Sequence, residues 1–461
     1  MKYKGKNFLV LGLKKSGISA IEFLIKKRAN VYCYDDKEKL KNVIELSKQN
    51  VYEIKKINDD VISKMDYIIV SPGVSKYHEA VKLAILYNKK VLGELELGLK
   101  EAKGDIIAIT GSNGKTTTVN LIEQAFNYAK KRNLLVGNVG NPITKFVSKR
   151  KTNYIVEVSS FQLETCKIEP KIACILNLSE NHLDRHFSFK EYKETKYRIF
   201  ENMGSEDLLI LNYDDENLRQ LESKKTVIFD KKIDIKAKIL WFSRKNIIDG
   251  AYIDGDEICY KKGNKIINIA KLDEVKLIGE HNLENILCFV CVCLLKKIKV
   301  KFIREVITNF RGVGHRLEYV KSVDGVDYIN DSKSTTCTST LTAVKSFTKP
   351  IILILGGSDK GLNYDDLALK LKDKVKLSIL TGEISEKLKE SFIKSGNENF
   401  EVKKDFFEAI NFAKSKANKG DVVLLSPATA SFDEFENFEK RGEKFIEIVN
   451  SFNEGAIGIE K

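Results

Sequence analysis

The sequence predicts an α/β protein of three domains, each built around a mostly parallel sheet. Three observations lead to this prediction. The chain of 461 residues is too long for one ordinary hydrophobic core. Short apolar strands recur along it, each followed by a turn and a helix, which is the pattern of repeated βαβ units. Shares of 43% hydrophobic and 31% charged residues are typical of a soluble globular protein.

The first 93 residues are predicted to form a small Rossmann-like domain of the nucleotide-binding type. Its first strand ends at Gly12, its second is followed at once by Asp35 and Asp36, and its third ends in the sharp turn Ser71-Pro72-Gly73. Because ligands of parallel sheets bind beyond the carboxyl ends of the strands, these turns form the candidate binding edge. The expected elements are strands 7–12, 31–34 and 67–70, a turn at 14–17 and a helix at 18–26.

Two further domains are predicted, a central one over 94–311 and a C-terminal Rossmann-like one over 312–461. In the central domain we expect strands at 106–110, 154–158, 173–178 and 207–211, a β-rich insertion at 225–275, and helices at 282–297 and 301–310. In the C-terminal domain we expect strands at 351–355, 377–380 and 422–425 with helices between them. The alternation of strands and helices again indicates doubly wound sheets.

The most specific motif is the glycine-rich turn Thr110-Gly111-Ser112-Asn113-Gly114-Lys115-Thr116, between an apolar strand and a helix. Glycines let backbone N–H groups close around phosphate oxygens, and the helix N-terminus adds partial positive charge. We expect Lys115 to reach the β- and γ-phosphates of a nucleotide and Thr116 to bind Mg²⁺. The general phosphate-loop pattern has another Gly where Ile109 stands, so this is a shortened form. A glycine-rich turn with a solvated lysine is the alternative.

Two later strands end near candidate metal ligands. Glu157 follows the apolar run Tyr154–Val156, and a hard carboxylate at this place suits Mg²⁺. His182 follows the next strand, and two of the five histidines of the chain lie in this segment. We expect His182 to bind a second metal ion or to act as a general base; a capping or surface histidine is the alternative.

Together these motifs resemble the Mur ligase and folylpolyglutamate synthetase superfamily. The chain shares with it the phosphate loop, Glu157, His182, and the patterns Gly279–Asn285 and Gly314–Glu318. Asn330-Asp331-Ser332-Lys333 is typical of the Mur ligases that add D-glutamate. The segments that resemble the same members are Ser71–Val74, Ser159–Glu164 and Leu425–Asp433, so the resemblance extends from Gly12 to Gly442.

The resemblance implies an ATP-dependent ligase of peptidoglycan synthesis that activates UDP-N-acetylmuramoyl-L-alanine as an acyl-phosphate and joins it to D-glutamate. The first domain would then bind the UDP part, the central domain ATP with two Mg²⁺ ions, and the C-terminal domain D-glutamate. In this superfamily a lysine at the position of Lys196 is carbamylated and helps to hold the second Mg²⁺. Its amine must be neutral to react with CO₂, so burial beside cations must depress its pKa from the ordinary ~10.4.

The resemblance also assigns the site residues. Catalysis is expected to depend on Lys115, His182 and Lys196. The metal ligands are expected to be Thr116, Glu157, His182 and Lys196. ATP is expected at Gly111, Ser112, Asn113, Gly114, Lys115, Thr116, Thr117, Asn282, Arg316 and Asp331. The UDP-substrate is expected at Gly12, Lys37, Gly73, Asn138, Ser159, Gln162 and His182. D-glutamate is expected at Lys333, Thr335, Lys360, Ser431 and Phe438. Lys37 stands where the family often has Arg, and Thr336 where it often has Asn.

Composition bears on partners and location. The net charge is +14, but the lysines are spread along the chain and no basic run is interleaved with aromatics, so we expect no nucleic-acid partner. No apolar run reaches the roughly 18 residues of a membrane span, so we expect no membrane insertion. Eight scattered Cys predict reduced thiols in the cytoplasm. Cys288, Cys291 and Cys293 lie in an apolar helical run, where packing is a better interpretation than metal binding.

Three other functions explain fewer of the motifs. A folylpolyglutamate-type ligase would use the same chemistry, but the Asn330–Lys333 motif and the uridine-type first domain argue against it. A basic nucleic-acid ATPase explains the phosphate loop and the charge only. A dinucleotide oxidoreductase explains Gly12 and Asp35 only. We expect the ligase to act as a monomer on small-molecule substrates.

Overall fold

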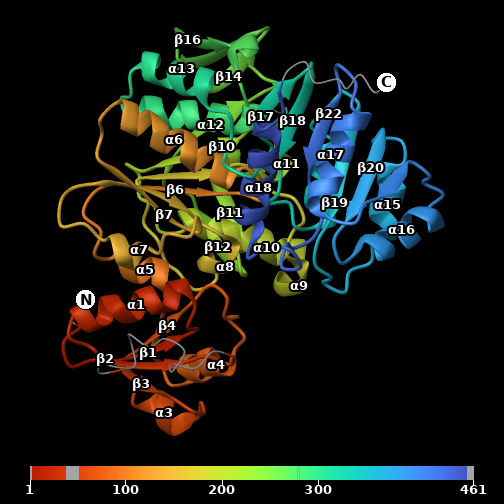
Figure 1. The fold of residues 1–461 in the computed structure, drawn as a ribbon. Helices are drawn as coiled ribbons and strands as arrows, with labels where there is room; N and C mark the ends of the chain where they lie inside the picture. Colours follow the sequence, from red (N-terminus) through yellow and green to blue (C-terminus); the bar gives the residue numbers. More distant parts are fainter. Residues whose placement is uncertain (1–2, 38–50, 278, 280, 454–461) are drawn as a thin grey trace, which may run out of the picture. The chain divides into compact units, whose positions relative to one another are not determined.

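The computed structural model describes residues 3–37, 51–277, 279 and 281–453, and the statements below refer to these residues (Figure 1). The chain forms two compact units. The first comprises Met1–Val275 with His281–Asn309, and the second Lys276–Glu280 with Phe310–Lys461. Each contains doubly wound α/β structure, which confirms the predicted fold class.

The first unit begins with a five-stranded parallel sheet whose strand order is β3-β2-β1-β4-β5. One face packs on α1, through Phe8 and Val10, and the other on α3 and α4, through Leu9 and Leu11 (Figure 1). The strands are β1 (Asn7–Leu11), β2 (Asn30–Tyr34), β3 (Val51–Glu53), β4 (Tyr67–Val70) and β5 (Lys90–Gly93). The helices are α1 (Lys15–Lys26), α3 (Asp59–Ser63) and α4 (Glu79–Leu86).

Helix α1 begins at Lys15, so the predicted turn at 14–17 was wrong in part. Lys14 is the extended residue before the helix and has no capping hydrogen bond from its side chain, so the sequence carries no start signal there. The helix begins directly after β1 because Gly17 packs on Gly12. A Cβ at Gly17 would lie 1.7 Å from the Gly12 carbonyl oxygen, which only glycine avoids.

The central sheet has the strand order β16-β15-β14-β13-β10-β9-β6-β8-β7. From β14 to β7 all its neighbours are parallel, whereas β14-β15 and β15-β16 are antiparallel. Its strands are β6 (Ile106–Thr110), β7 (Asn133–Gly137), β8 (Asn153–Glu157), β9 (Ile172–Ile175), β10 (Leu208–Asn212), β13 (Lys238–Ser243), β14 (Gly250–Asp254), β15 (Glu257–Lys262) and β16 (Lys265–Lys271).

The predicted β-rich region at 225–275 is present, but it is not one separate insertion. Only β11 (Lys225–Ile228) and β12 (Lys231–Asp234) form an independent hairpin. The strands β13 to β16 extend the central sheet instead, because β13 pairs in parallel with β10. A pairing partner this far along the chain has no local sequence signal.

Helices cover the central sheet. They are α5 (Glu94–Leu99), α6 (Lys115–Tyr128), α7 (Ile143–Phe146), α8 (Ser160–Leu163), α9 (Leu183–His186), α10 (Phe189–Tyr197), α11 (Glu216–Arg219), α12 (His281–Leu295) and α13 (Val300–Asn309). The short 3₁₀ helices are η2 (Arg198–Phe200), η3 (Gln220–Ser223) and η4 (Leu272–Glu274). Cys288, Cys291 and Cys293 lie on α12 and are fully buried, as predicted for packing. Among the described residues, none of the helices is long and apolar enough to cross a membrane.

The second unit contains a sheet of order β17-β18-β22-β19-β20-β21, parallel except for β17. Helices α14 to α16 pack on one face and α17 with α18 on the other (Figure 1). The strands are β17 (Glu318–Val323), β18 (Val326–Asn330), β19 (Ile351–Gly356), β20 (Leu377–Thr381), β21 (Phe400–Val402) and β22 (Val422–Leu425). The helices are α14 (Cys337–Val344), α15 (Asp365–Leu371), α16 (Ser385–Lys394), α17 (Phe406–Lys416) and α18 (Phe438–Asn450).

Candidate active site

The phosphate loop joins β6 to α6 and depends on two glycines with left-handed backbone. Gly111 has φ 156° and Gly114 has φ 83°. A Cβ on Gly114 would lie 2.0 Å from Oδ1 of Asn285, so α12 packs directly on the loop. Helix α6 has no side-chain cap at its N-terminus. Its first-turn N–H groups therefore form an end that suits an anion.

The loop is held by its own bonds in this structure. Lys115 Nζ donates to the carbonyl oxygens of Gly111 at 2.7 Å and Ser112 at 3.0 Å. The Ser112 N–H donates to the Asn177 carbonyl, and the Asn113 N–H to Asn177 Oδ1, both at 2.9 Å. The two threonines that follow differ in burial, Thr116 being half-buried and Thr117 buried. Asn177 follows β9 and holds the loop through these two bonds. The amino-acid sequence contained no indication of this role.

Glu157 lies at the carboxyl end of β8, which is the strand next to β6. Its Oε1 accepts a hydrogen bond from Asn138 Nδ2 at 2.7 Å. Its Oε2 is buried and has no hydrogen-bond partner. A buried carboxylate oxygen without a donor is costly unless something positive meets it, so Glu157 fits a magnesium ligand.

Lys196 lies on α10 and is 1% exposed. Its Nζ donates to the Gly111 carbonyl at 3.0 Å and to Thr110 Oγ1 at 3.3 Å, directly on the phosphate loop. Burial, and then the nearby charge of Lys115, lower the pKa of Lys196 well below its usual value, while Glu157 acts in the opposite direction. This lowering of the Lys196 pKa is in the direction that carbamylation requires.

His182 lies outside this buried cluster of contacts. It is exposed, has φ 53°, and meets the Phe161 ring edge-on with centroids 4.8 Å apart. Within the described ranges, no group of three or more His, Cys, Asp or Glu is arranged to hold a metal ion. The predicted set of Glu157, His182 and Lys196 contains only two residues of these types. Its convergence on one metal site therefore stays a prediction.

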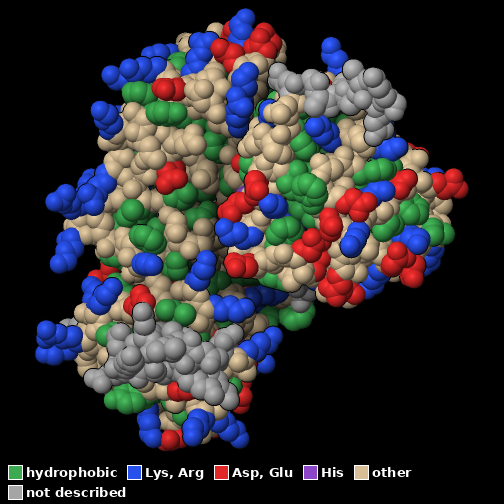
Figure 2. Space-filling model, in the orientation of Figure 1, with side chains coloured by type: hydrophobic (Ala, Val, Ile, Leu, Met, Phe, Trp, Pro, Cys, Tyr) green, Lys and Arg blue, Asp and Glu red, His purple; other side chains and the backbone are tan. Residues whose placement is uncertain are grey.

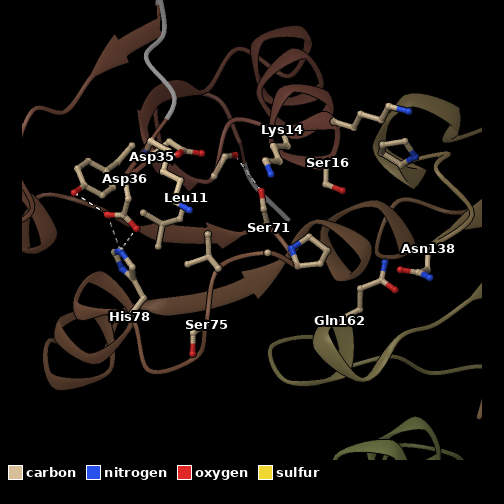
Figure 3. A pocket seen from close by; sticks show the side chains of 18 of the residues that line it. Leu11, Lys14, Ser16, Asp35, Asp36, Ser71, Ser75, His78, Asn138 and Gln162 are labelled. Atoms are coloured by element: carbon tan, nitrogen blue, oxygen red, sulfur yellow. Dashed lines mark hydrogen bonds and ion pairs between the residues drawn. The ribbon is translucent and has the colours of Figure 1, made fainter. Parts of the chain in front are cut away.

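A cavity of about 910 Å³ lies where the first sheet meets the central sheet (Figure 3). It opens at the carboxyl ends of β1, β2 and β4, where the strand order reverses, which is the expected binding place in such sheets. Five residues predicted for the UDP-substrate line it: Gly12, Lys37, Gly73, Asn138 and Gln162. Ser159 does not line the cavity itself, but it forms a reciprocal capping box with the lining residue Gln162 at the start of α8. His182 is not among the lining residues.

Several lining residues were given no individual role from the sequence, although Asp35, Asp36 and Ser71 lie in the turns predicted as the binding edge. Asp35 fixes the turn below the cavity by accepting from the N–H groups of Leu13 at 2.7 Å and Lys37 at 2.9 Å. His78 Nε2 lies 3.4 Å from Asp36 (Figure 3). The other lining residues with polar side chains and no role assigned from the sequence are Lys14, Lys15, Ser16, Tyr34, Ser71 and Ser75. The available signal was the pair of lysines directly after the first strand, since cations beyond the end of a parallel strand suit an anionic ligand.

The predicted adenine-nucleotide residues outside the loop are divided between the two units. Asn282 in the first is buried and accepts from Asn285 Nδ2 at 2.8 Å. Asp331 and Arg316 lie in the second. Asp331 accepts from Ser426 Oγ at 2.7 Å, and burial raises its pKa to about 6, with Arg316 acting weakly in the opposite direction.

The predicted D-glutamate residues gather at the carboxyl ends of β18, β19 and β22, which are neighbouring strands. Lys333 Nζ lies 5.8 Å from the centre of the Phe438 ring. Lys360 Nζ donates to the Thr335 carbonyl at 3.2 Å, and burial lowers the pKa of Lys360. Ser431 is buried.

The missed residue Arg441 ties these strand ends together. Its guanidinium donates to the carbonyls of Ser332 at 3.0 Å, Ala430 at 3.1 Å and Gly356 at 3.3 Å. The loops that carry Lys333, Lys360 and Ser431 are therefore held by one side chain.

His186 should make the stability of the first unit depend on pH. It is fully buried, with Nε2 3.0 Å from Ser160 Oγ, and burial lowers its pKa from 6.5 to about 4. The unfolded chain binds this proton near pH 6.5 and the folded chain only near pH 4. The free energy of unfolding should therefore fall by about 3 kcal/mol as the pH drops through this window. Urea unfolding of wild type and His186→Asn at several pH values measures this fall in the free energy of unfolding. An equal dependence on pH in both proteins would contradict the assignment to His186.

Basic side chains are spread over the face shown in Figure 2, among acidic and apolar ones, rather than gathered in one patch.

Three family models match the chain. They are the MurD-like N-terminal domain of Mur ligases over residues 6–93, the Mur ligase middle domain over 109–293, and the glutamate ligase domain of Mur ligases over 315–429. These matches confirm the predicted three-domain plan.

Two similar curated proteins are UDP-N-acetylmuramoylalanine--D-glutamate ligases. That of Clostridioides difficile (strain 630) is 38% identical over 467 residues, covering 98% of this chain and 100% of the relative. That of Caldanaerobacter subterraneus subsp. tengcongensis is 38% identical over 459 residues, covering 97% and 99%.

Two solved structures share the fold. The UDP-N-acetylmuramate-alanine ligase MurC from Thermotoga maritima has a TM-score of 0.57 at 17% identity, covering 97% of this chain and 99% of that one. The MurF ligase from Thermotoga maritima, in complex with ADP, has a TM-score of 0.56 at 15% identity, covering 96% and 94%.

Proposed function

This chain belongs to the Mur ligase family, and we propose that it joins D-glutamate to UDP-N-acetylmuramoyl-L-alanine in peptidoglycan synthesis, with ATP as the phosphoryl donor. The observation that best supports the chemistry is the buried Lys196 amine on the carbonyl of the phosphate-loop residue Gly111, where burial and Lys115 lower its pKa. The curated relatives are named D-glutamate ligases, and none of the similar proteins described above is named for folate, so the folylpolyglutamate alternative has no support.

The proposed nucleotide and metal site lies around the phosphate loop. Residues 111–117 would receive the phosphates of ATP, and Asn282, Arg316 and Asp331 the nucleoside. Thr116, Glu157, His182 and a carbamylated Lys196 would hold two Mg²⁺ ions, which neutralise the phosphate oxygens when bound. For carbamylation, the neutral amine adds to CO₂ and releases one proton, so that a potential cation becomes an anion. Nζ keeps one N–H, which allows the bond to Gly111 to persist.

The other substrates are assigned to the remaining strand ends. We assign residues 1–93 to the UDP part, 94–311 to ATP and 312–461 to the amino acid. The cavity would hold the UDP-substrate, with Asn138 connecting it to Glu157 through its 2.7 Å hydrogen bond. Lys333 and Lys360 would meet the carboxylates of D-glutamate, and Thr335, Ser431 and Phe438 would complete that pocket.

The mechanism follows from the charges. The substrate carboxylate attacks the γ-phosphate of ATP, and two anions must approach each other. Lys115 and the uncapped N-terminus of α6 offset this repulsion. The D-glutamate amine, once neutral, then attacks the acyl-phosphate carbonyl, and the tetrahedral oxyanion collapses to the amide and free phosphate. Water must be kept from the acyl-phosphate, because it would hydrolyse this intermediate.

An assay of phosphate release from ATP tests the function. Release should require UDP-N-acetylmuramoyl-L-alanine and D-glutamate together, and a folate or DNA in place of the UDP-substrate should give none.

Within this assay, Lys333→Met or Lys360→Met should raise the KM for D-glutamate at least about tenfold, because each removes a cation from the site of a dianionic ligand. The KM for ATP should change far less. Equal changes in both constants would contradict a role in amino-acid binding.

A further inference from the structure

One wall of the cavity is a loop that is bonded both to its own sheet and to the central segment of the chain. The Ser71–His78 loop runs from the end of β4 to the start of α4, and most of its residues line the cavity (Figure 3). Ser71 Oγ donates to the Gly12 carbonyl at 3.1 Å and His78 Nε2 lies 3.4 Å from Asp36, so both ends of the loop contact their own sheet. The stretch between these ends is tied to the central segment of the chain.

Arg185, on α9, makes the strongest of these ties. Its Nη1 donates to the Pro72 carbonyl at 2.9 Å and its Nη2 to the Val74 carbonyl at 3.0 Å, so it holds the loop on both sides of Gly73. The same guanidinium pairs with both oxygens of Glu164, through Nη2 at 2.6 Å and Nε at 3.2 Å. The Arg185 side chain is 15% exposed and that of Glu164 only 1%.

The surroundings fix this guanidinium further. Its Cζ lies 4.2 Å from the centre of the Phe161 ring, which also meets His182. A planar cation held between a carboxylate fork and an aromatic face has little freedom, and a lysine does not reproduce its geometry. Glu164 is buried, and removing the cation from a buried ion pair is costly.

A second contact ties the far half of the loop to α10. Glu191 accepts from Lys76 Nζ at 2.6 Å and from the Tyr77 hydroxyl at 3.2 Å. The Tyr77 ring packs on Phe187, with centroids 5.4 Å apart. The middle of the loop is thus bonded, through Pro72, Val74, Lys76 and Tyr77, to the segment that carries His182 and Lys196.

We propose that Arg185 is a positioning residue, which fixes the Ser71–His78 loop and thereby completes the pocket for the UDP part of the substrate. This inference depends on the proposed function. Arg185 does not line the cavity, and it acts through the backbone of residues that do.

Arg185→Ala and Arg185→Lys test the proposal, with Arg198→Ala as the matched control. Arg198 is 16% exposed and donates to the Glu164 carbonyl at 2.6 Å, so it braces the same end of α8 without a described bond to the loop. The measurements are the KM for each substrate, calorimetric binding of UDP-N-acetylmuramoyl-L-alanine without ATP, the melting temperature, and hydrogen exchange of residues 71–78.

For Arg185→Ala we expect a rise of about tenfold or more in the KM for the UDP-substrate, a KM for ATP within about twofold, and faster exchange of the loop. Arg185→Lys should recover little of the affinity, whereas millimolar guanidinium ion should partly restore it in Arg185→Ala. Arg198→Ala should lower the melting temperature while leaving the KM for the UDP-substrate within about twofold.

Two results would overturn the proposal. One is an unchanged KM and unchanged loop exchange in Arg185→Ala. The other is an equal rise of this KM in Arg198→Ala, which would show a general loss of packing. If wild type itself does not bind the UDP-substrate, the proposed function fails, and loop exchange still decides whether Arg185 holds the loop.

Discussion

Lys115→Ala should lower the turnover number at least about a hundredfold, the loss expected when one preorganised charge is removed from a transition state. In this structure Lys115 Nζ is bonded to the Gly111 and Ser112 carbonyls, so it is already at the loop on which the phosphates would lie. As the γ-phosphoryl group moves, charge builds on its oxygens, and the ammonium stabilises that charge more than the ground state. Steady-state kinetics of phosphate release measure the effect.

The melting temperature separates chemistry from folding in this test. Lys115 is half-buried and its bonds are to loop carbonyls, so its loss should change stability little. Lys130→Ala, in the turn after α6, is the control and should keep wild-type turnover. Near-normal turnover in Lys115→Ala would show that the loop does not serve phosphoryl transfer.

Lys196→Ala should abolish most of the activity, and added short carboxylates such as acetate should restore part of it. The alanine leaves a space beside Gly111 and Thr110, where a small anion can take the place of the carbamate. Restoration by an anion distinguishes a missing negative charge from a missing helix residue. The measurement is activity against carboxylate concentration, with chloride at equal ionic strength as a blank.

Lys190→Ala on the same helix is the matched control, because Lys190 is exposed. It should change stability by under about 0.5 kcal/mol and respond to acetate no more than wild type. An experimental structure with nucleotide and both metals bound, showing an unmodified Lys196 amine, would falsify carbamylation.

The sequence predicted the fold most accurately where burial is strongest. The strands Tyr67–Val70, Ile106–Thr110 and Val422–Leu425 have the predicted bounds, because each is a short apolar run that ends in a turn. The start of α1 was misplaced because its first turn has no capping side chain. The extension of the central sheet by β13 to β16 was missed, since strand pairing between distant segments is not encoded locally.

In the candidate site, too, features set by neighbouring residues were predicted, whereas contacts between distant segments were not. The phosphate loop was readable because a strand, two glycines and a helix follow one another along the chain. The burial of Lys196 followed only from the family resemblance, because on composition it is one lysine among many and only the fold places it against Gly111. Asn177, Arg185 and Arg441 act through bonds to backbone atoms of distant segments, and such bonds leave no pattern in the sequence.

The buried thiols on α12 should react with alkylating reagents only when this part of the protein opens. Of the eight cysteines, only Cys337 is more than slightly accessible, and burial raises the pKa of the Cys288, Cys291 and Cys293 thiols. Alkylating reagents need the thiolate and a path to it, so the native protein should react slowly at α12. Mass-spectrometric labelling of these sites would therefore time the opening of the nucleotide-binding segment itself, since α12 packs on the phosphate loop through Asn285.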